Sequence, residues 1–358
     1  MIKVLAVCCN FTWGGVEQVI LNEIDNIDRE KYQIDVLLPK DKYCDRVEAL
    51  DERNVKVLRY DDNGITNKFK NFYKLLKNSD YDIIHFHTGH ESALLCLAAK
   101  CAHVDKMIVH AHTTLTGDEN TSFLHVQMKK LICFFSHIVY SVFSKKVACS
   151  KEAAKFMFGK RYNYCEIIFN GIDMNRFSKK DFNKFRKGIC INARFDAQKN
   201  PVFVVDVISE LCKIDDNIHL DWIGTGPLEN EVRNRIAELN LDEHINLIGS
   251  TNRVEEILKR NDFFLLPSLC EGLGICLIEA QAVGLKCFIS DCIPDEANCG
   301  GCVKISLDKT AKEWANIIYS EMINNPEANI IEDKINNFNI KYTVHQFEEL
   351  YSELAGCR

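Results

Sequence analysis

The stretch "FFLLPSLCEGLGICLIEAQAVG", Phe263–Gly284, has the order of a buried strand, a short loop and a helix. "FFLL" is a continuous apolar run, and "ICLIEAQAV" predicts a helix that begins just after Gly274. The loop glycines Gly272 and Gly274 let the backbone approach a ligand closely, and free N–H groups at a helix start attract phosphate. We therefore expect a ligand-binding loop at the end of this strand.

Two carboxylates border that loop. Glu271 follows the strand directly, and Glu279 lies about one turn into the helix. Carboxylates on both sides of a phosphate site suit a ligand with two polyols, such as the ribose and the sugar of a nucleotide-sugar. The alternative is a solvated helix glutamate and an unrelated loop glutamate.

The rest of the chain repeats the order of strand and helix. In the first half, residues 14–28 predict an amphipathic helix, and apolar runs predict strands at 2–9, 32–39, 55–60, 82–87, 107–112 and 146–150. The second half predicts strands at 188–194, 218–224, 245–249, 262–268 and 286–290, with helices near 200–213, 227–239, 252–260 and 275–283. This alternation indicates an α/β fold with parallel sheets covered by helices on both faces.

The alternation of strands and helices begins again after Asn170-Gly171, which predicts two doubly wound domains with a ligand in the cleft between them. We expect the first domain over residues 1–169 and the second over residues 170–340. Residues 341–358 predict a closing helix that packs back towards the first domain, and residues 324–339 predict a polar connection.

The composition excludes several classes of protein. A chain of 358 residues with 47% hydrophobic and 27% charged residues is typical of a soluble enzyme, and a net charge of -7 argues against a nucleic-acid binder. The sequence shows no secretory signal and no long apolar run, so we expect a cytoplasmic protein whose 17 cysteines are reduced. One Cys-Gly-Gly-Cys pair, Cys299 and Cys302, lacks the second pair that a zinc site needs.

Two cations stand in a loop of the same half. "NARFDAQKN" places Arg194 and Lys199 after a strand, where they suit a diphosphate group, although a solvated loop pair would look the same. "WIGTGPLEN" resembles a dinucleotide loop but lacks the third glycine, and a tight loop fits it equally well.

These motifs together resemble a known family. "ARFDAQKNP", "GTGPL" and "PSLCEGLGICLIEAQAVGLKCFISD" look like the donor-binding half of retaining GT-B glycosyltransferases of family 4. "GGVEQVI", "IVHAHTT", "ACSKEAAKFMFG" and "IFNGIDMNRF" are similar to the branch that makes exopolysaccharides and capsular polysaccharides. The resemblance implies two Rossmann-like domains that face each other across a cleft. It also implies retention of configuration without an essential metal or a cofactor.

The resemblance assigns roles to single residues. It implies that Arg194 and Lys199 bind the donor diphosphate, that Glu271 contacts the transferred sugar and that Glu279 binds the ribose. The implied catalytic residues are His112, Glu271, Arg194 and Lys199. The implied donor-binding residues are Gly14, Gly15, Arg194, Lys199, Glu271, Gly272, Leu273, Gly274 and Glu279.

The sequence departs from the family pattern at two positions. Asn192 stands where glycine is more usual, and Lys286 stands where proline is common. Neither change removes a catalytic group, although Lys286 could alter the local turn.

The histidines leave alternatives open. The resemblance places His112 near the transferred sugar, with His110 as the second choice. "HFHTGH" holds His85 and His87, and a His-x-His pair on a strand points both rings to one face, which suits a metal or a pair of hydrogen-bonded core histidines. We favour the core interpretation. Asp80-Tyr-Asp82 would suit a metal-dependent transferase, but its place before a strand indicates a strand entry.

The predicted function is transfer of a sugar from a nucleoside diphosphate donor, UDP-sugar first, to a lipid-linked or oligosaccharide acceptor in surface polysaccharide biosynthesis. Residues 123–146 are rich in aromatic residues and carry basic pairs, so they predict either an interfacial helix at the inner face of the cell membrane or a long core helix. Two other functions remain open: a non-catalytic relative that binds a glycan or a partner protein, and a nucleotide-sugar epimerase of similar architecture.

Overall fold

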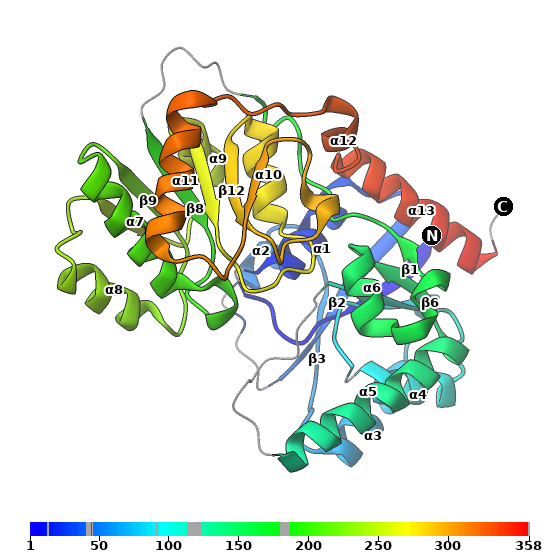
Figure 1. Ribbon diagram of the computed structural model, residues 1–358. Helices are drawn as coiled ribbons and strands as arrows, with labels where there is room; N and C mark the ends of the chain where they lie inside the picture. Colours follow the sequence, from blue (N-terminus) through cyan, green and yellow to red (C-terminus); the bar gives the residue numbers. More distant parts are fainter. Residues whose placement is uncertain are drawn as a thin grey trace. The chain divides into compact units, whose positions relative to one another are not determined.

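The structure is a computed structural model that describes residues 1–12, 14–40, 44, 46–90, 92–112, 123–179 and 187–356, with side chains except at 123–130. The chain divides into two compact units (Figure 1). Unit 1 consists of Met1–Gly171 and Ile340–Arg358, and unit 2 consists of Ile172–Asn339. The last helix thus belongs to the same unit as the first half of the chain.

Unit 1 contains a seven-stranded sheet in the order β3-β2-β1-β4-β5-β6-β7, in which every pairing is parallel. The inner strands β4 and β5 are buried along their length and β1 is buried over its last four residues, which explains their continuous apolar runs. The strands are β1 (Ile2–Val7), β2 (Tyr32–Pro39), β3 (Val57–Tyr60), β4 (Ile83–Phe86), β5 (Met107–Ala111), β6 (Lys145–Ala148) and β7 (Glu166–Ile167).

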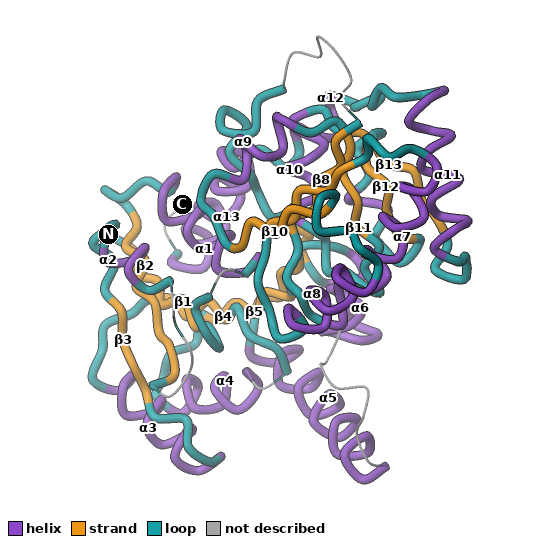
Figure 2. Tube along the Cα trace, turned by 90° about the vertical axis from the view of Figure 1, so that its left-hand side faces the viewer, coloured by secondary structure: helices purple, strands orange, loops and turns teal. Residues whose placement is uncertain are grey.

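Helices connect these strands and cover the sheet. They are α1 (Gly15–Asn26), α2 (Glu48–Asp51), α3 (Ile65–Lys77), α4 (Ser92–Cys101), α5 (Phe123–Phe143), α6 (Lys151–Phe158), the 3-10 helix η1 (Gly159–Tyr164) and α13 (Ile340–Ala355). Helix α13 comes from the far end of the sequence and lies beside α1, as the traces in Figures 1 and 2 show. Its buried residues Val344, Phe347 and Tyr351 join the core cluster of unit 1.

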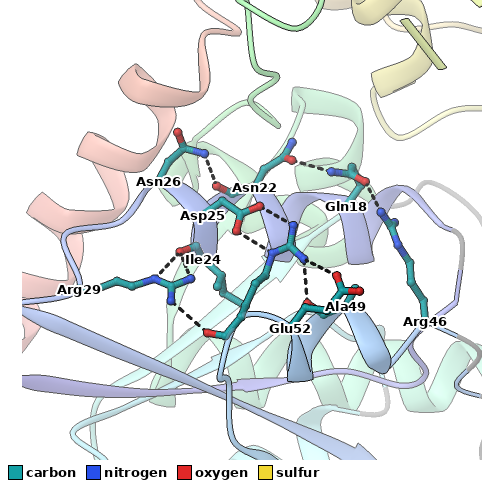
Figure 3. A network of polar contacts seen from close by, with 10 residues as sticks. Gln18, Asn22, Ile24, Asp25, Asn26, Arg29, Arg46, Ala49 and Glu52 are labelled. Atoms are coloured by element: carbon teal, nitrogen blue, oxygen red, sulfur yellow. Dashed lines mark hydrogen bonds and ion pairs between the residues drawn. The ribbon is translucent and has the colours of Figure 1, made fainter. Parts of the chain in front are cut away.

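A network of polar contacts fixes α1 against the segment that contains α2 (Figure 3). The guanidinium groups of Arg29, Arg46 and Arg53 are all hydrogen-bonded, and Arg46 donates to the side chain of Gln18. Arg53 binds Asp25 through two hydrogen bonds of 2.6 and 2.8 Å and also donates to the carbonyl of Ala49, while Arg29 donates to the carbonyl of Ile24. These bonds orient the helix that follows β1.

Unit 2 contains a six-stranded parallel sheet in the order β10-β9-β8-β11-β12-β13. Its strands are β8 (Gly188–Asn192), β9 (His219–Ile223), β10 (Ile245–Gly249), β11 (Phe263–Leu266), β12 (Lys286–Ser290) and β13 (Cys302–Ile305). Its helices are η2 (Ala197–Lys199), α7 (Pro201–Ile214), α8 (Glu229–Glu238), α9 (Val254–Arg260), α10 (Ile275–Val283), η3 (Asp295–Ala297), α11 (Ala311–Asn324) and α12 (Glu332–Asn336). The two parallel sheets confirm the predicted α/β class.

One expectation about the second half needs a correction. The stretch over residues 324–339 is more than a polar connection, because α12 forms within it and buries Ile335 and Phe338. In the part of the chain that the structure describes, no helix is both long and apolar enough to cross a bilayer.

Candidate functional site

The loop between β11 and α10 ends in a glycine with a left-handed backbone. Gly274 has a φ of 81°, which favours glycine over every residue with a Cβ, and α10 begins at the next residue. The first N–H groups of a helix lack partners within it, and the positive end of the helix dipole lies there. Gly272 and Leu273 are buried and fix the loop in place. This helix start is therefore favourable for an anionic group.

Glu271 lies in this loop as a buried carboxylate with two hydrogen-bonding side chains. Its Oε1 accepts from Lys199 Nζ at 2.5 Å and from Ser268 Oγ at 2.7 Å. Only 6% of the Glu271 side chain and 17% of the Lys199 side chain are exposed, so the ion pair is shielded from water. Strands β8 and β11 are parallel neighbours, which brings the loops that follow them together.

Lys199 is held in place by local structure. It ends η2, whose first turn is capped by the Asp196 carboxylate through a hydrogen bond from the Lys199 N–H. Burial is the largest single influence and lowers the pKa of Lys199, but Glu271, Cys276 and Asp196 together outweigh it, so the pKa is raised above its usual value. Lys199 is therefore a fixed cation at the end of the sheet.

Arg194 follows β8 and differs from Lys199 in its surroundings. Half of its side chain is exposed, and its contact with Asp196 is loose, at 3.8 Å. A guanidinium in this state can turn towards an anion without breaking a strong ion pair.

The glycine loop after β9 packs against the segment that carries Arg194. A Cβ on Gly224 would lie 2.1 Å from the carbonyl oxygen of Ala193, and a Cβ on Gly226 would lie 2.6 Å from that of Phe195. Backbone atoms cannot give way at such distances, so both glycines serve close packing. This supports the tight-loop interpretation of "GTGP".

Glu279 is the second carboxylate, on α10. It is 7% exposed, and its Oε2 accepts one long hydrogen bond, 3.5 Å, from Asn192 Nδ2. Burial raises the pKa of Glu279 to about 7, although the Arg176 charge and the Asn192 bond act against this. Asn192, a departure from the family pattern, thus faces a residue expected to bind ribose.

Two residues of this site were missed from the sequence. Ser268 bonds Glu271, and Arg176 places positive charge near Glu279. The place of Ser268 three residues before Glu271 was a usable signal, since both follow β11. The spacing of the sequence did not relate Arg176 to Glu279, because Arg176 precedes the first strand of unit 2.

Unit 1 positions the expected glycines at the start of α1. Gly14 is the residue before the helix and Gly15 is its first residue. A Cβ on Gly14 would lie 2.3 Å from Glu17 Oε2, so a larger residue would displace that carboxylate. The Glu17 carboxylate thus packs over Gly14 at the start of α1 and also accepts a hydrogen bond from the Thr12 N–H.

His112 follows β5 and has a histidine neighbour. Its Nε2 lies 3.0 Å from Nδ1 of His87, and the two rings are stacked. Burial lowers the pKa of His112 to about 4, while the Asn170 side chain acts in the opposite direction. Its alternative, His110, is buried beside it with a ring-centroid distance of 3.9 Å. His112 is therefore neutral near pH 7.

The remaining motifs have structural explanations. Asp80 pairs with Lys3, and Asp82 accepts a hydrogen bond from the Lys3 N–H, so the Asp-Tyr-Asp motif fastens β1 beside the entry to β4. Lys286 is buried and pairs with Glu321 at 2.5 Å, which shows how β12 accommodates a lysine at this position.

Two family models match most of the chain. The family model "Glycosyltransferase Family 4" matches residues 13–176, and the model "Glycosyl transferases group 1" matches residues 174–300. EpsF of Bacillus subtilis (strain 168) is 29% identical over 336 residues, which cover 88% of this chain and 86% of EpsF.

Two further relatives cover nearly the whole chain. The capsular polysaccharide biosynthesis glycosyltransferase CapH of Staphylococcus aureus is 26% identical, covering 98% of this chain and 99% of CapH. The UDP-Gal:alpha-D-GlcNAc-diphosphoundecaprenol alpha-1,3-galactosyltransferase of Escherichia coli is 25% identical, covering 96% of this chain and 94% of the relative. Among solved structures, HepE of Anabaena in complex with UDP and glucose superposes with a TM-score of 0.79 at 15% identity, over 98% of this chain and 100% of HepE.

The fold is of the GT-B type, because the superposition on HepE extends over both units. Within that class the chain belongs to the retaining glycosyltransferases of family 4, whose two models together extend from residue 13 to residue 300. This confirms the predicted family, fold and type of enzyme. The roles given to single residues stay predictions.

Proposed function

We propose that this enzyme transfers a sugar from a UDP-sugar to a lipid-linked or oligosaccharide acceptor in surface polysaccharide biosynthesis. The observation that most strongly supports a donor site here is the buried Lys199–Glu271 ion pair beside the start of α10. A fixed cation and a helix N-terminus are the two elements that a departing diphosphate requires. HepE was solved with UDP and glucose, and CapH is described as a capsular polysaccharide enzyme.

Each site residue has a distinct task in this proposal. Lys199 and Arg194 stabilise the negative charge that grows on the diphosphate as the bond to the sugar breaks, Arg194 by turning its exposed guanidinium onto it. Glu271, held in place by Lys199 and Ser268, contacts a hydroxyl of the transferred sugar. Glu279 accepts from the ribose, and neutral His112 contacts the transferred sugar.

The donor assignment is tested by calorimetric titration of the full chain with UDP, GDP and ADP sugars. We expect UDP-sugars to bind, and Lys199→Ala and Glu279→Ala to weaken binding roughly tenfold or more. Lys312→Ala is the matched control, since Lys312 is exposed on α11. Binding of none of these donors, or equal binding by all variants, would contradict the proposal. An epimerase would instead release altered sugar without an acceptor.

The acceptor proposal rests on the outer face of α5. Leu131, Phe134, Phe135, Ile138 and Val142 repeat at helical spacing and are all exposed, whereas Ser136, Val139 and Tyr140 on the opposite side are buried. A surface helix of a soluble protein normally exposes polar side chains, not a row of large apolar ones.

Basic residues lie in two elements, β6 and η1, that contact α5. Lys145 and Lys146 follow the helix in β6, and Arg161 on the adjacent η1 is close enough to lower the pKa of Lys146, for which burial is the larger cause. An apolar face bordered by cations fits an anionic bilayer surface. The Escherichia coli relative is named for an acceptor on diphosphoundecaprenol, a lipid that would be met there.

Vesicle flotation tests this surface separately from the donor site. We expect the full chain to float with phosphatidylglycerol vesicles, to float less with phosphatidylcholine vesicles, and to lose flotation as Leu131→Ser/Phe134→Ser. Ile323→Ser, at an exposed position of α11, is the control. Equal flotation of the double variant and the wild type would remove α5 from the proposal.

A further inference from the structure

Four histidines form a buried cluster at the ends of β4 and β5. The rings come in two close pairs, His85 with His87 at 4.0 Å between centroids and His110 with His112 at 3.9 Å. His85 and His110 are in addition stacked at 5.4 Å. Because side chains alternate along a strand, all four rings project from the same face of the sheet of unit 1.

The cluster leaves ring nitrogens without hydrogen bonds. Among the described residues, Nε2 of His85, Nε2 of His87 and both ring nitrogens of His110 are buried and have no partner. His85, His87 and His110 are each less than 10% exposed. A buried polar atom without a partner costs about 1–3 kcal/mol, so four together are a large penalty for a core that serves packing alone.

The hydrogen bonds that do exist fix where the lone pairs lie. Nδ1 of His85 lies 2.7 Å from the hydroxyl of Tyr351, which in turn lies 2.5 Å from Glu23 Oε1. With Tyr351 donating to Glu23, the tyrosine oxygen accepts from Nδ1–H of His85. A neutral His85 then presents the lone pair of its Nε2 to the other rings.

We propose that His85, His87 and His110 bind a divalent transition-metal ion, Zn²⁺ first. One nitrogen of each ring can be chosen so that all three lie within 4.8 Å of one another. Three histidines are a common set of zinc ligands, and the fourth position then belongs to a water or a solute. A tetrahedral Zn²⁺ with bonds of about 2.0–2.1 Å brings its nitrogens closer than this, so the rings close slightly on binding.

The surroundings support the ligands in the manner of known metal sites. A ligating histidine usually donates its other N–H to a carboxylate, directly or through a relay, and the chain His85–Tyr351–Glu23 does this. On the other side, Nδ1 of His87 lies against His112, so the ion would orient the residue expected to contact the sugar.

The ion is not part of the proposed donor chemistry. Sugar transfer in the proposal above uses Lys199 and Arg194 of unit 2 for the diphosphate, whereas the proposed ligands all belong to unit 1. Metal binding is therefore measured without a donor, and its failure leaves the proposed function untouched.

The experiment uses the full chain, freed of metal with a chelator and then titrated with Zn²⁺ and Co²⁺. We expect one ion per chain by elemental analysis, and a Co²⁺ spectrum without the near-ultraviolet thiolate band that cysteine ligation produces. His85→Gln and His110→Gln should each weaken binding by roughly 100-fold. His345→Gln, at an exposed position of α13, should bind like the wild type.

Circular dichroism in the presence of chelator shows whether the variants fold. If one does not, Tyr351→Phe removes the hydrogen bond to His85 without removing a ligand and should weaken binding roughly tenfold. Substoichiometric binding by the wild type, a thiolate band, or binding unchanged in the histidine variants would overturn the proposal.

Discussion

The two units bury polar side chains in opposite ways. In unit 2, Lys199 and Glu271 are charged, lie 2.5 Å apart and are supported by Ser268. In unit 1, the histidine cluster is neutral, because burial lowers the pKa of His85 to about 3 and those of His87 and His110 well below the usual value. Several of its nitrogens lack partners in the described structure.

This difference indicates which site is complete without an ion. A buried charge pair with matched hydrogen bonds is stable as it stands, and a ligand has only to add to it. A neutral cluster with unused lone pairs gains hydrogen bonds or metal bonds when something enters. Replacing a buried polar side chain by an apolar one should therefore lower the stability of unit 2 and raise that of metal-free unit 1.

The largest effect is expected from breaking the charge pair. Lys199→Met leaves the Glu271 carboxylate buried without the lysine charge that neutralises it, which should lower the free energy of unfolding by about 3–5 kcal/mol and the transfer rate by about 100-fold or more. Chemical denaturation and initial-rate assays measure the two losses.

A second variant separates charge from packing. Lys199→Met/Glu271→Gln removes both charges, so most of the stability should return while the rate stays low. A double variant as unstable as Lys199→Met alone would show that the lost packing of Lys199, rather than its charge, matters.

Glu279 lies between the two extremes, since it is buried with one long hydrogen bond. Its pKa in the folded protein, about 7, exceeds its usual value of 4.5, so folding favours the protonated form. The resulting stability is present at low pH and is lost as pH rises through 7. Glu279→Gln should then be more stable than the wild type by about 3 kcal/mol at pH 8, and the difference should shrink as pH falls from 7 and vanish below about pH 4.

Donor binding should show the complementary trend. Ribose hydroxyls donate to the carboxylate form, so the affinity of the wild type for its donor should rise as pH increases through 7, and that of Glu279→Gln should not. A flat profile in the wild type would contradict the ribose contact.

The histidine cluster should respond in the opposite direction from the charge pair. In metal-free protein, His110→Leu removes two ring nitrogens that lack partners and leaves an apolar side chain of similar volume. We expect a gain of about 1–3 kcal/mol in the free energy of unfolding. A loss of stability would mean that water satisfies these nitrogens in solution.

The sequence predicted the elements and the ends of the strands well, and the contacts between side chains less well. The order of strand, loop and helix in Phe263–Gly284 follows from its apolar pattern and its glycines. The bond between Lys199 and Glu271 spans 72 positions and depends on β8 and β11 being neighbours in the sheet, which periodicity does not determine.

The contact between His87 and His112 and the exposure of the apolar face of α5 could not be predicted from the sequence, for different reasons. The hydrogen bond between His87 and His112 depends on ring rotation, which sequence spacing leaves open. The apolar residues of α5 fitted either a core helix or an interfacial one, because a helical repeat shows a face and not what covers it.

The smallest effect tests whether the charge pair needs its support. Ser268→Ala removes the hydrogen bond from Oγ to Glu271 Oε1 and leaves Lys199 as the named partner of that oxygen. Because a charge-assisted bond is lost but the ion pair remains, we expect about 1–2 kcal/mol less stability and a modest rise in KM for the donor, with kcat nearly unchanged. Ser268→Thr keeps the hydroxyl and is the matched control. If Ser268→Ala lowered the rate as far as Lys199→Met, the serine would act on the reacting groups themselves, and the pair would no longer count as complete without it.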